Sequence, residues 1–123
     1  MYRARVEAWF AAAHRLTHYN GKCERLHGHN YRVRLWVSGA HLGEGGMLVD
    51  FGALKSTLGK VLAGLDHSDL NEIAEFRQDP SAERIAEYIF RAVKTEAPDL
   101  PVSAVDVFET DVNMARYEPE PKI

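Results

Sequence analysis

Cysteine, excess positive charge and long apolar runs are all scarce in this chain of 123 residues. The single cysteine cannot form a disulfide bond within the chain, which is typical of proteins from a reducing compartment. A formal net charge of −3 argues against non-specific binding of nucleic acid, which requires a broad basic face. No run is apolar enough for a signal peptide or a membrane-spanning helix, so we expect a cytoplasmic protein without a membrane partner.

The composition is that of an ordinary globular protein. Hydrophobic residues make up 46% of the chain and charged residues 27%, and a chain of 123 residues suffices for one domain with its own core. We expect this domain to cover residues 1–118 and to be followed by a polar tail over residues 119–123.

The spacing of apolar residues predicts an α+β domain. Alternation of apolar and polar residues predicts four strands, over 2–14, 29–38, 102–109 and 112–118. Helical spacing predicts two helices, over 51–65 and 82–96. Asn20-Gly21 predicts a turn between the first two strands, and Ser81 is a suitable residue to begin the second helix. The order β-β-α-α-β-β favours an antiparallel sheet with both helices on one face, whose open edges often pair with other copies.

Three histidines converge in the hairpin that the first two strands form. Residues i and i+2 of a strand point to the same face, so His27 and His29 project together. Antiparallel pairing brings His14, at the end of the first strand, close to both. Three imidazoles leave a fourth position open, which suits a catalytic Zn²⁺ rather than a purely structural one. The His-x-His pattern alone fits a surface turn as well, and the third histidine is what favours a metal site.

Three further positions carry reactive groups, and each has a structural alternative. Cys23 lies in a polar loop near the histidines, where a cation favours its thiolate, although a lone cysteine is often a small buried apolar residue. Asp66 and His67 follow the first helix, as a candidate acid/base pair or simply as a polar helix end. Glu109 falls on the apolar side of its strand. It is either a carboxylate that binds a guanidine-like edge of a ligand or an ordinary residue before a turn.

Six sequence blocks occur together in a specific order and spacing. They are FAAAHRL, CERLHGHNY, LVDFGALK, LDHSDLN, PSAERIAEYI and the final FET. In this order they resemble the 6-pyruvoyltetrahydropterin synthase / 6-carboxytetrahydropterin synthase family. The resemblance implies the tunnelling fold (T-fold), in which β-β-α-α-β-β subunits join edge to edge into trimers and two trimers stack into a hexamer. It also implies active sites at the subunit interfaces of this homo-oligomer.

The resemblance assigns a role to each candidate residue. By it, the Zn²⁺ ligands are His14, His27 and His29, the catalytic residues are Cys23, Asp66 and His67, and the substrate-binding residues are Glu109, Ser81 and Glu83. Asp66 and His67 match an acid/base pair that a neighbouring subunit supplies. Glu109 matches the carboxylate that binds the 2-amino-pyrimidinone edge of the pterin. Ala82 departs from the family pattern, because relatives often carry a hydroxyl there.

The resemblance also implies 7,8-dihydroneopterin triphosphate as the small-molecule substrate. One branch of the family eliminates triphosphate and forms 6-pyruvoyltetrahydropterin. Another also releases acetaldehyde and forms 6-carboxy-5,6,7,8-tetrahydropterin, the precursor of queuosine. The short CxxxHGH spacing and the compact chain favour this carboxy-forming lyase. A third branch uses a glutamate in place of the cysteine, and Glu24 adjoins Cys23. A non-catalytic module that binds zinc and pterin is disfavoured, because Cys23, Asp66 and His67 are all present.

Overall fold

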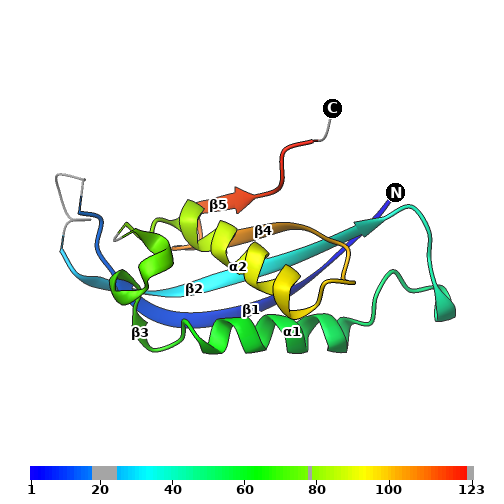
Figure 1. Ribbon diagram of the computed structural model, residues 1–123, viewed down its shortest axis with the longest axis horizontal. Coiled ribbons are helices and arrows are strands. Elements are labelled where there is room, and N and C mark those ends of the chain that lie inside the picture. The colour runs from blue at the N-terminus through cyan, green and yellow to red at the C-terminus, as the bar shows by residue number, and fades with distance from the viewer. Residues whose placement is uncertain (18–24, 78, 122–123) are drawn as a thin grey trace.

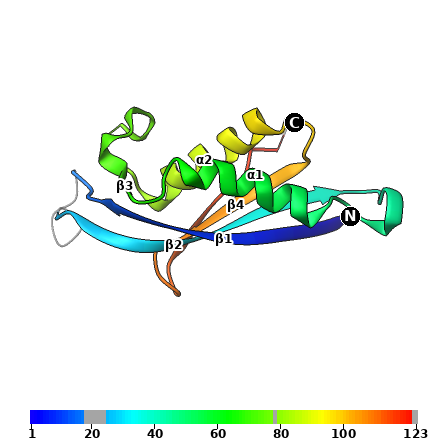
Figure 2. The same ribbon diagram turned by 90° about the horizontal axis from the view of Figure 1, so that it is seen from below.

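A computed structural model describes residues 1–17, 25–77 and 79–121 of the chain. Within these ranges one sheet has the strand order β3-β1-β2-β4-β5. Its strands are β1 (Tyr2–His14), β2 (His27–Gly39), β3 (Ser68–Asp69), β4 (Val102–Phe108) and β5 (Met114–Tyr117). The helices α1 (Phe51–Ala63) and α2 (Ala82–Glu96) pack on one face of this sheet (Figures 1 and 2). None of the described helices has the length and apolar character needed to span a bilayer.

The predicted order of two strands, two helices and two strands is confirmed, with one addition. The short strand β3 pairs with β1 in parallel at Ala12 and Ala13, so the sheet is mixed rather than antiparallel. A strand of two residues is too short to produce an alternating pattern, which is why the sequence did not predict it. The 3-10 helices η3 (Leu70–Glu72) and η4 (Ala74–Phe76) follow β3. The predicted turn at Asn20-Gly21 lies outside the described residues.

The element boundaries follow local chemistry. β2 begins at His27 rather than at residue 29, so both residues of the His-x-His pattern lie in the strand. α1 ends at Ala63 rather than at residue 65, because the N–H of Gly64 turns back to the carbonyl of Val61 and caps the helix. α2 has the predicted bounds, since the hydroxyl of Ser81 accepts a hydrogen bond from the N–H of Arg84 at 3.2 Å.

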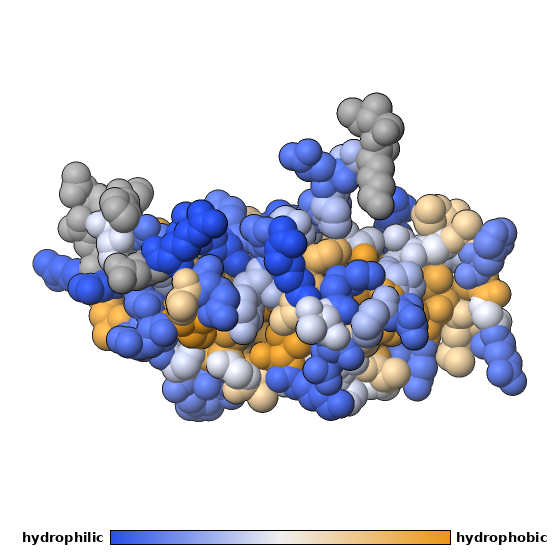
Figure 3. Space-filling model, viewed as in Figure 1, coloured by the Kyte–Doolittle hydropathy of each residue, from blue (hydrophilic) through white to orange (hydrophobic). Residues whose placement is uncertain are grey.

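The core lies between the sheet and the two helices. Alternate side chains of the long strands face the helices, as period-2 patterning requires. The helices contribute inner stripes of buried side chains, which are Leu54, Leu58 and Leu62 in α1 and Ile85, Ile89 and Val93 in α2. Hydrophilic side chains cover much of the surface seen in Figure 3. The burial of the apolar stripes is therefore the main force that fixes the helices on the sheet.

The fold brings three chain segments to one end of the sheet. β1 and β2 are antiparallel with a register that runs from Tyr2 opposite Gly39 to His14 opposite His27. The end of β1, the start of α2 and the end of β4 all lie at the left in Figure 1. Together with the start of β2, which pairs with the end of β1, these segments supply the residues predicted to bind metal and substrate.

Candidate active site

Three imidazole rings meet at the end of the β1–β2 pair. His14 faces His27 across the two strands, and His29 lies two residues further along β2. The ring centroids are 4.6 Å apart for His14 and His27, 5.0 Å for His14 and His29, and 4.8 Å for His27 and His29. One nitrogen from each ring lies within 4.8 Å of the others, so the three residues form a group that could hold a metal ion.

Backbone carbonyl groups fix the orientation of two of these rings. His14 Nδ1 donates a hydrogen bond to the carbonyl oxygen of Pro80 at 2.8 Å, and His27 Nδ1 donates to that of Arg25 at 2.7 Å. A carbonyl oxygen can only accept, so Nδ1 carries a proton in both rings, and in the neutral ring Nε2 carries the lone pair. Both Nε2 atoms therefore point into the cluster, where they could bind a metal. Carbonyl groups that accept from the outer nitrogen orient histidine ligands in the same way at metal sites.

The inner nitrogens of the neutral rings are arranged to share a cation. His14 Nε2 and His27 Nε2 are 3.0 Å apart, so two lone pairs face each other. His29 Nε2 is buried without a hydrogen-bond partner among the described residues. Two nitrogen ligands at about 2.05 Å from a tetrahedral metal would lie about 3.3 Å apart, close to the observed separation. A metal ion bound by all three lone pairs removes the repulsion and satisfies the buried nitrogen, so the donor set fits such an ion.

The electrostatic environment keeps His29 ready to bind a metal. Burial lowers the pKa of His29 below its usual value of 6.5, and the neighbouring His14 and His27 act in the same direction. The carboxylate and backbone of Glu109 oppose this shift. The net result favours the neutral imidazole, which is the form that coordinates metals.

A cavity of about 260 Å³ adjoins this cluster through Glu109, and it brings together the three predicted substrate-binding residues. Ser81 and Glu83 at the start of α2 line it together with Glu109 at the end of β4, and the other lining residues are Leu16, Ala82, Asn113, Met114 and Ala115. Glu109 is only partly buried, and its N–H donates to the carbonyl of Asn113 at 3.2 Å in the turn between β4 and β5. Electrostatic coupling between Glu109 and His29 links the cavity to the three histidines.

Asp66 and His67 form a pair at the outer edge of β1. Asp66 Oδ1 accepts the N–H of Ala11 at 2.9 Å, and the N–H of His67 donates to the carbonyl of Ala11 at 2.6 Å. The imidazole Nδ1 of His67 lies 3.0 Å from Asp66 Oδ2. The Ala11 N–H lowers the pKa of Asp66, so this carboxylate stays charged and orients the imidazole. The backbone of His67, directly before β3, has a positive φ of 58°.

The Asp66–His67 pair lies at an open cavity of about 470 Å³, which His67 lines together with His29. The side chain of His67 is 83% exposed. Among the described residues, no hydrogen bond or ring contact joins this pair to His14, His27 or His29. Within one chain, His67 and His29 therefore share an open cavity, without a hydrogen bond or ring contact between the described parts of the pair and the three histidines. Cys23, the predicted catalytic cysteine, and its neighbour Glu24 lie outside the described residues.

Sequence reasoning missed two groups of this site. The carbonyl of Pro80 that orients His14 is part of the backbone, and no sequence pattern marks where a carbonyl will point. The hydroxyl of Tyr31 is buried without a hydrogen-bond partner among the described residues. The centroid of the Tyr31 ring lies 5.8 Å from that of His14 and 5.3 Å from that of His29. The strand parity of Tyr31, which it shares with His27 and His29, could have placed it beside them.

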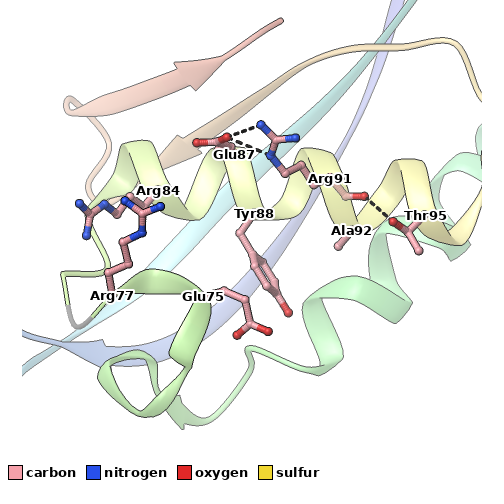
Figure 4. A pocket seen from close by; sticks show the side chains of 8 residues that line it. All are labelled: Glu75, Arg77, Arg84, Glu87, Tyr88, Arg91, Ala92 and Thr95. Atoms are coloured by element: carbon pink, nitrogen blue, oxygen red, sulfur yellow. Dashed lines mark hydrogen bonds and ion pairs between the residues drawn. The ribbon is translucent and has the colours of Figure 1, made fainter.

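A second, separate cavity of about 420 Å³ lies between α2 and the segment around η4 (Figure 4). Arginine and glutamate side chains dominate its lining, which consists of Glu75, Arg77, Arg84, Glu87, Tyr88, Arg91, Ala92 and Thr95. The guanidinium of Arg91 donates two hydrogen bonds to Glu87, at 2.9 and 2.6 Å, which pairs these opposite charges. None of the residues predicted for the active site lines this cavity.

Comparison with known sequences points to one family. The model of the family described as 6-pyruvoyl tetrahydropterin synthase matches residues 3–120. The 6-carboxy-5,6,7,8-tetrahydropterin synthase of Synechocystis sp. is 41% identical over 114 residues, which cover 88% of this chain and 86% of the relative. The enzyme of the same name from Bacillus subtilis is 35% identical over 109 residues, which cover 81% of this chain and 73% of the relative.

Solved structures agree with the sequence comparison. The 6-pyruvoyl tetrahydropterin synthase of Caenorhabditis elegans superposes with a TM-score of 0.86 at 27% identity, over 97% of this chain and 96% of that one. The enzyme of the same name from Plasmodium falciparum gives a TM-score of 0.73 at 24% identity, over 95% of this chain and 98% of that one, which supports the fold. These likenesses confirm the predicted T-fold.

Proposed function

The chain belongs to the 6-pyruvoyl tetrahydropterin synthase family and is an enzyme of the tetrahydropterin synthase type, and we propose that it forms 6-carboxy-5,6,7,8-tetrahydropterin. The proposed substrate is 7,8-dihydroneopterin triphosphate, and the other products are acetaldehyde and triphosphate. The names of the relatives with 41% and 35% identity support this branch. The reaction would serve queuosine and 7-deazapurine synthesis.

The observation that carries the proposal is the convergence of three imidazole nitrogens at the end of the β1–β2 pair. Three histidine ligands with an open fourth position are the donor set of catalytic Zn²⁺ sites. Bound there, Zn²⁺ would supply a Lewis acid that acidifies the side-chain hydroxyls of the substrate. The carbonyls of Pro80 and Arg25 hold His14 and His27 in the required tautomer, and burial keeps His29 neutral.

The cavity beside the histidines supports binding of the pterin ring. A pterin presents an amino group and a ring N–H side by side, and one carboxylate can accept both hydrogen bonds. Two carboxylates line this cavity, and Glu109 is the one that interacts electrostatically with His29. Ser81 and Glu83 line the same cavity, and the Ser81 hydroxyl is already engaged in capping α2. We therefore assign ring recognition chiefly to Glu109.

The proposed proton transfers use Cys23 together with the Asp66–His67 pair. Asp66 accepts the N–H of Ala11 and stays charged, so it can orient the imidazole of His67, whose Nδ1 lies 3.0 Å from Asp66 Oδ2. The thiolate of Cys23 and the Asp66–His67 pair would then move protons between the pterin ring carbon and the side chain of the substrate. Because His67 is exposed at the edge of β1, the pair would serve the metal cluster of a neighbouring chain.

The proposed assembly is a trimer, or a dimer of trimers, with sites between subunits. Within the described residues, the outer edge of β1 pairs with β3 only at Ala12 and Ala13, which leaves the rest of a long strand open. Trp9 and Phe51 are 56% and 58% exposed and line a cavity beside that edge together with Arg5, Val6, Glu7, Gly52 and Lys55. Open edges with exposed aromatic side chains favour pairing with another copy.

Product identification tests the reaction. Zinc-loaded protein is incubated with 7,8-dihydroneopterin triphosphate, and the pterin product and released aldehyde are analysed. Acetaldehyde and the 6-carboxy product support the proposal. The 6-pyruvoyl product without acetaldehyde would assign the chain to the branch of the Caenorhabditis elegans enzyme, which its fold likeness makes the second candidate. Glycolaldehyde would indicate the glutamate-dependent branch, and an absence of turnover would indicate a binding module.

Two variants separate the proposed roles. Cys23→Ala should abolish turnover and leave the zinc content unchanged, because the thiolate is not one of the three ligands. His27→Ala should instead lose the metal, because it removes one of three ligands and leaves His14 Nε2 without its neighbour. An active Cys23→Ala protein would contradict the proposed role of the thiolate.

A further inference from the structure

The turn over residues 79–81 touches both halves of the candidate site. The carbonyl of Pro80 accepts the hydrogen bond from His14 Nδ1 at 2.8 Å. The next residue, Ser81, caps α2 and lines the cavity proposed for the pterin. Pro80 itself is buried. The position of this turn therefore decides how His14 is oriented and where one wall of the cavity stands.

Asp79 ties this turn to the segment that leaves β1. Its Oδ1 atom accepts two hydrogen bonds from Thr17, from the backbone N–H at 2.8 Å and from the side-chain Oγ1 at 2.7 Å. Thr17 follows the metal-binding end of β1, three positions after His14. One carboxylate thus joins the segment after His14 to the turn whose carbonyl holds the His14 ring.

Arg84 supports the turn from the other side. Its Nη1 atom donates to the carbonyl of Phe76 at 2.9 Å and to that of Asp79 at 3.4 Å. The N–H of Asp79 also donates to the carbonyl of Phe76 at 3.0 Å. The Pro80 carbonyl belongs to the same peptide group as the N–H of Ser81, which donates to the carbonyl of Asp79 at 2.8 Å. The placement of Asp79, which its carboxylate sets by holding Thr17, therefore governs the direction of the Pro80 carbonyl.

We propose that Asp79 is a positioning residue for the metal centre. By holding Thr17, its carboxylate keeps the Pro80 carbonyl against His14 Nδ1, which fixes the tautomer and the ring plane that present Nε2 to the metal. Loss of the carbonyl partner on the outer nitrogen of a ligand histidine weakens metal binding by roughly 10- to 100-fold. The inference rests on the proposed function only in taking the three histidines as metal ligands.

The test measures zinc affinity in the purified full-length chain by competition with a chromophoric chelator. Asp79→Ala should bind zinc about 10- to 100-fold more weakly. Asp79→Asn should stay within a few-fold of the unchanged protein, because an amide oxygen can still accept both Thr17 hydrogen bonds. Asp99→Ala is the matched control, since Asp99 is exposed in the turn after α2, and it should bind zinc normally.

Circular dichroism of the metal-free variants shows whether each one folds. If Asp79→Ala does not fold, Thr17→Val provides the measurement. This variant removes the Oγ1 hydrogen bond to Asp79 and keeps the one from the backbone N–H. It should therefore weaken zinc binding by a smaller factor than Asp79→Ala. Zinc affinity unchanged in the folded Asp79→Ala protein, or in Thr17→Val where that variant is used, overturns the proposal. A failure of the proposed function looks different, because the unchanged protein would then release another product while the affinity loss in Asp79→Ala persists.

Discussion

His14 and His27 face each other across β1 and β2 with their Nε2 atoms 3.0 Å apart, while the outer nitrogen of each ring donates to a backbone carbonyl. Because both outer nitrogens carry the proton, two lone pairs meet inside the cluster. This arrangement is unfavourable in the metal-free protein and favourable around a cation. The same geometry that prepares the site for a metal therefore reduces the stability of the chain without one.

Metal loading should for this reason stabilise the fold. With free zinc at about 100 times its dissociation constant, linkage predicts about 2.7 kcal/mol of added stability. Chemical unfolding with zinc and with a strong chelator measures the difference. His27→Ala should lose this response, whereas His41→Ala, which changes an exposed histidine outside the cluster, should keep it. Equal unfolding curves with zinc and chelator would contradict the prediction.

Strand parity explains why the convergence of the three histidines could be predicted from sequence. The alternation in β1 and β2 placed His14, His27 and His29 on one face, and antiparallel pairing required that they meet. The bounds of α2 were equally predictable, since Ser81 is a strong N-cap and Ala97-Pro98 ends the helix. These features depend on residues close in sequence or on the pairing of two consecutive strands, and both leave a recognisable pattern in the sequence.

Features that depend on distant contacts were not predictable in the same way. The place of Asp66 and His67 at the edge of β1 follows from the pairing of β3 with Ala12 and Ala13, and β3 is too short to show a pattern. The carbonyl of Pro80 reached His14 only because α2 packs beside the end of β1. Tertiary packing sets both positions, so the family resemblance, rather than periodicity, supplied the role of His67.

Glu7, on the face of the sheet opposite the helices, should make the stability of the fold depend on pH. Its carboxylate accepts a hydrogen bond from Arg34 Nε at 2.8 Å, which lowers the pKa of Glu7 below its usual value of 4.5. The folded protein therefore binds fewer protons at this group than the unfolded chain. Its contribution to stability is present above the unfolded pKa and is lost as the pH falls through the lowered pKa.

Glu7→Gln should accordingly lower the free energy of unfolding at neutral pH by up to about 1 kcal/mol, the range of surface ion pairs. The deficit should shrink as the pH falls below the lowered pKa, because Glu7 is then protonated in the unchanged protein as well. Denaturant unfolding at neutral pH and at a pH below the lowered pKa measures this deficit. Glu44→Gln, at an exposed position outside the sheet, is the control. A deficit independent of pH would show that the ion pair with Arg34 is not its cause.

Tyr31 allows the cost of a buried hydroxyl to be measured. The ring stacks on Phe10 with centroids 4.7 Å apart and is fully buried, while the hydroxyl has no hydrogen-bond partner among the described residues. Tyr31→Phe removes the unsatisfied group and keeps the stacking. The metal-free variant should be as stable as the unchanged chain or more stable, by about 1 kcal/mol. A loss of similar size in chemical unfolding would show that the hydroxyl has a partner in solution.

Tyr31→Leu is the matched comparison, because it removes both the hydroxyl and the ring. It forfeits the stacking on Phe10 and leaves a cavity, so it should destabilise the chain by about 2–4 kcal/mol. The two variants together separate ring packing from the hydroxyl. If Tyr31→Phe and Tyr31→Leu cost the same, the stability of this region would not depend on the stacked rings.

The outward position of His67 predicts that two inactive variants restore activity to each other. His27→Ala removes a metal ligand and keeps the Asp66–His67 pair, whereas His67→Ala keeps the metal cluster and should retain its zinc. If each site combines the cluster of one chain with the pair of its neighbour, a mixed oligomer contains sites with both parts intact. For equal amounts and random assembly, about one quarter of the interfaces are of this kind.

The two variants are unfolded and refolded together, and turnover is compared with that of each variant refolded alone and of the unchanged protein treated in the same way. Activity near a quarter of the unchanged level supports sites shared between chains. If the unchanged protein recovers but the mixture stays inactive, His67 acts on the cluster of its own chain, and the segment after α1 must then move from the edge of β1 where Ala11 now holds it.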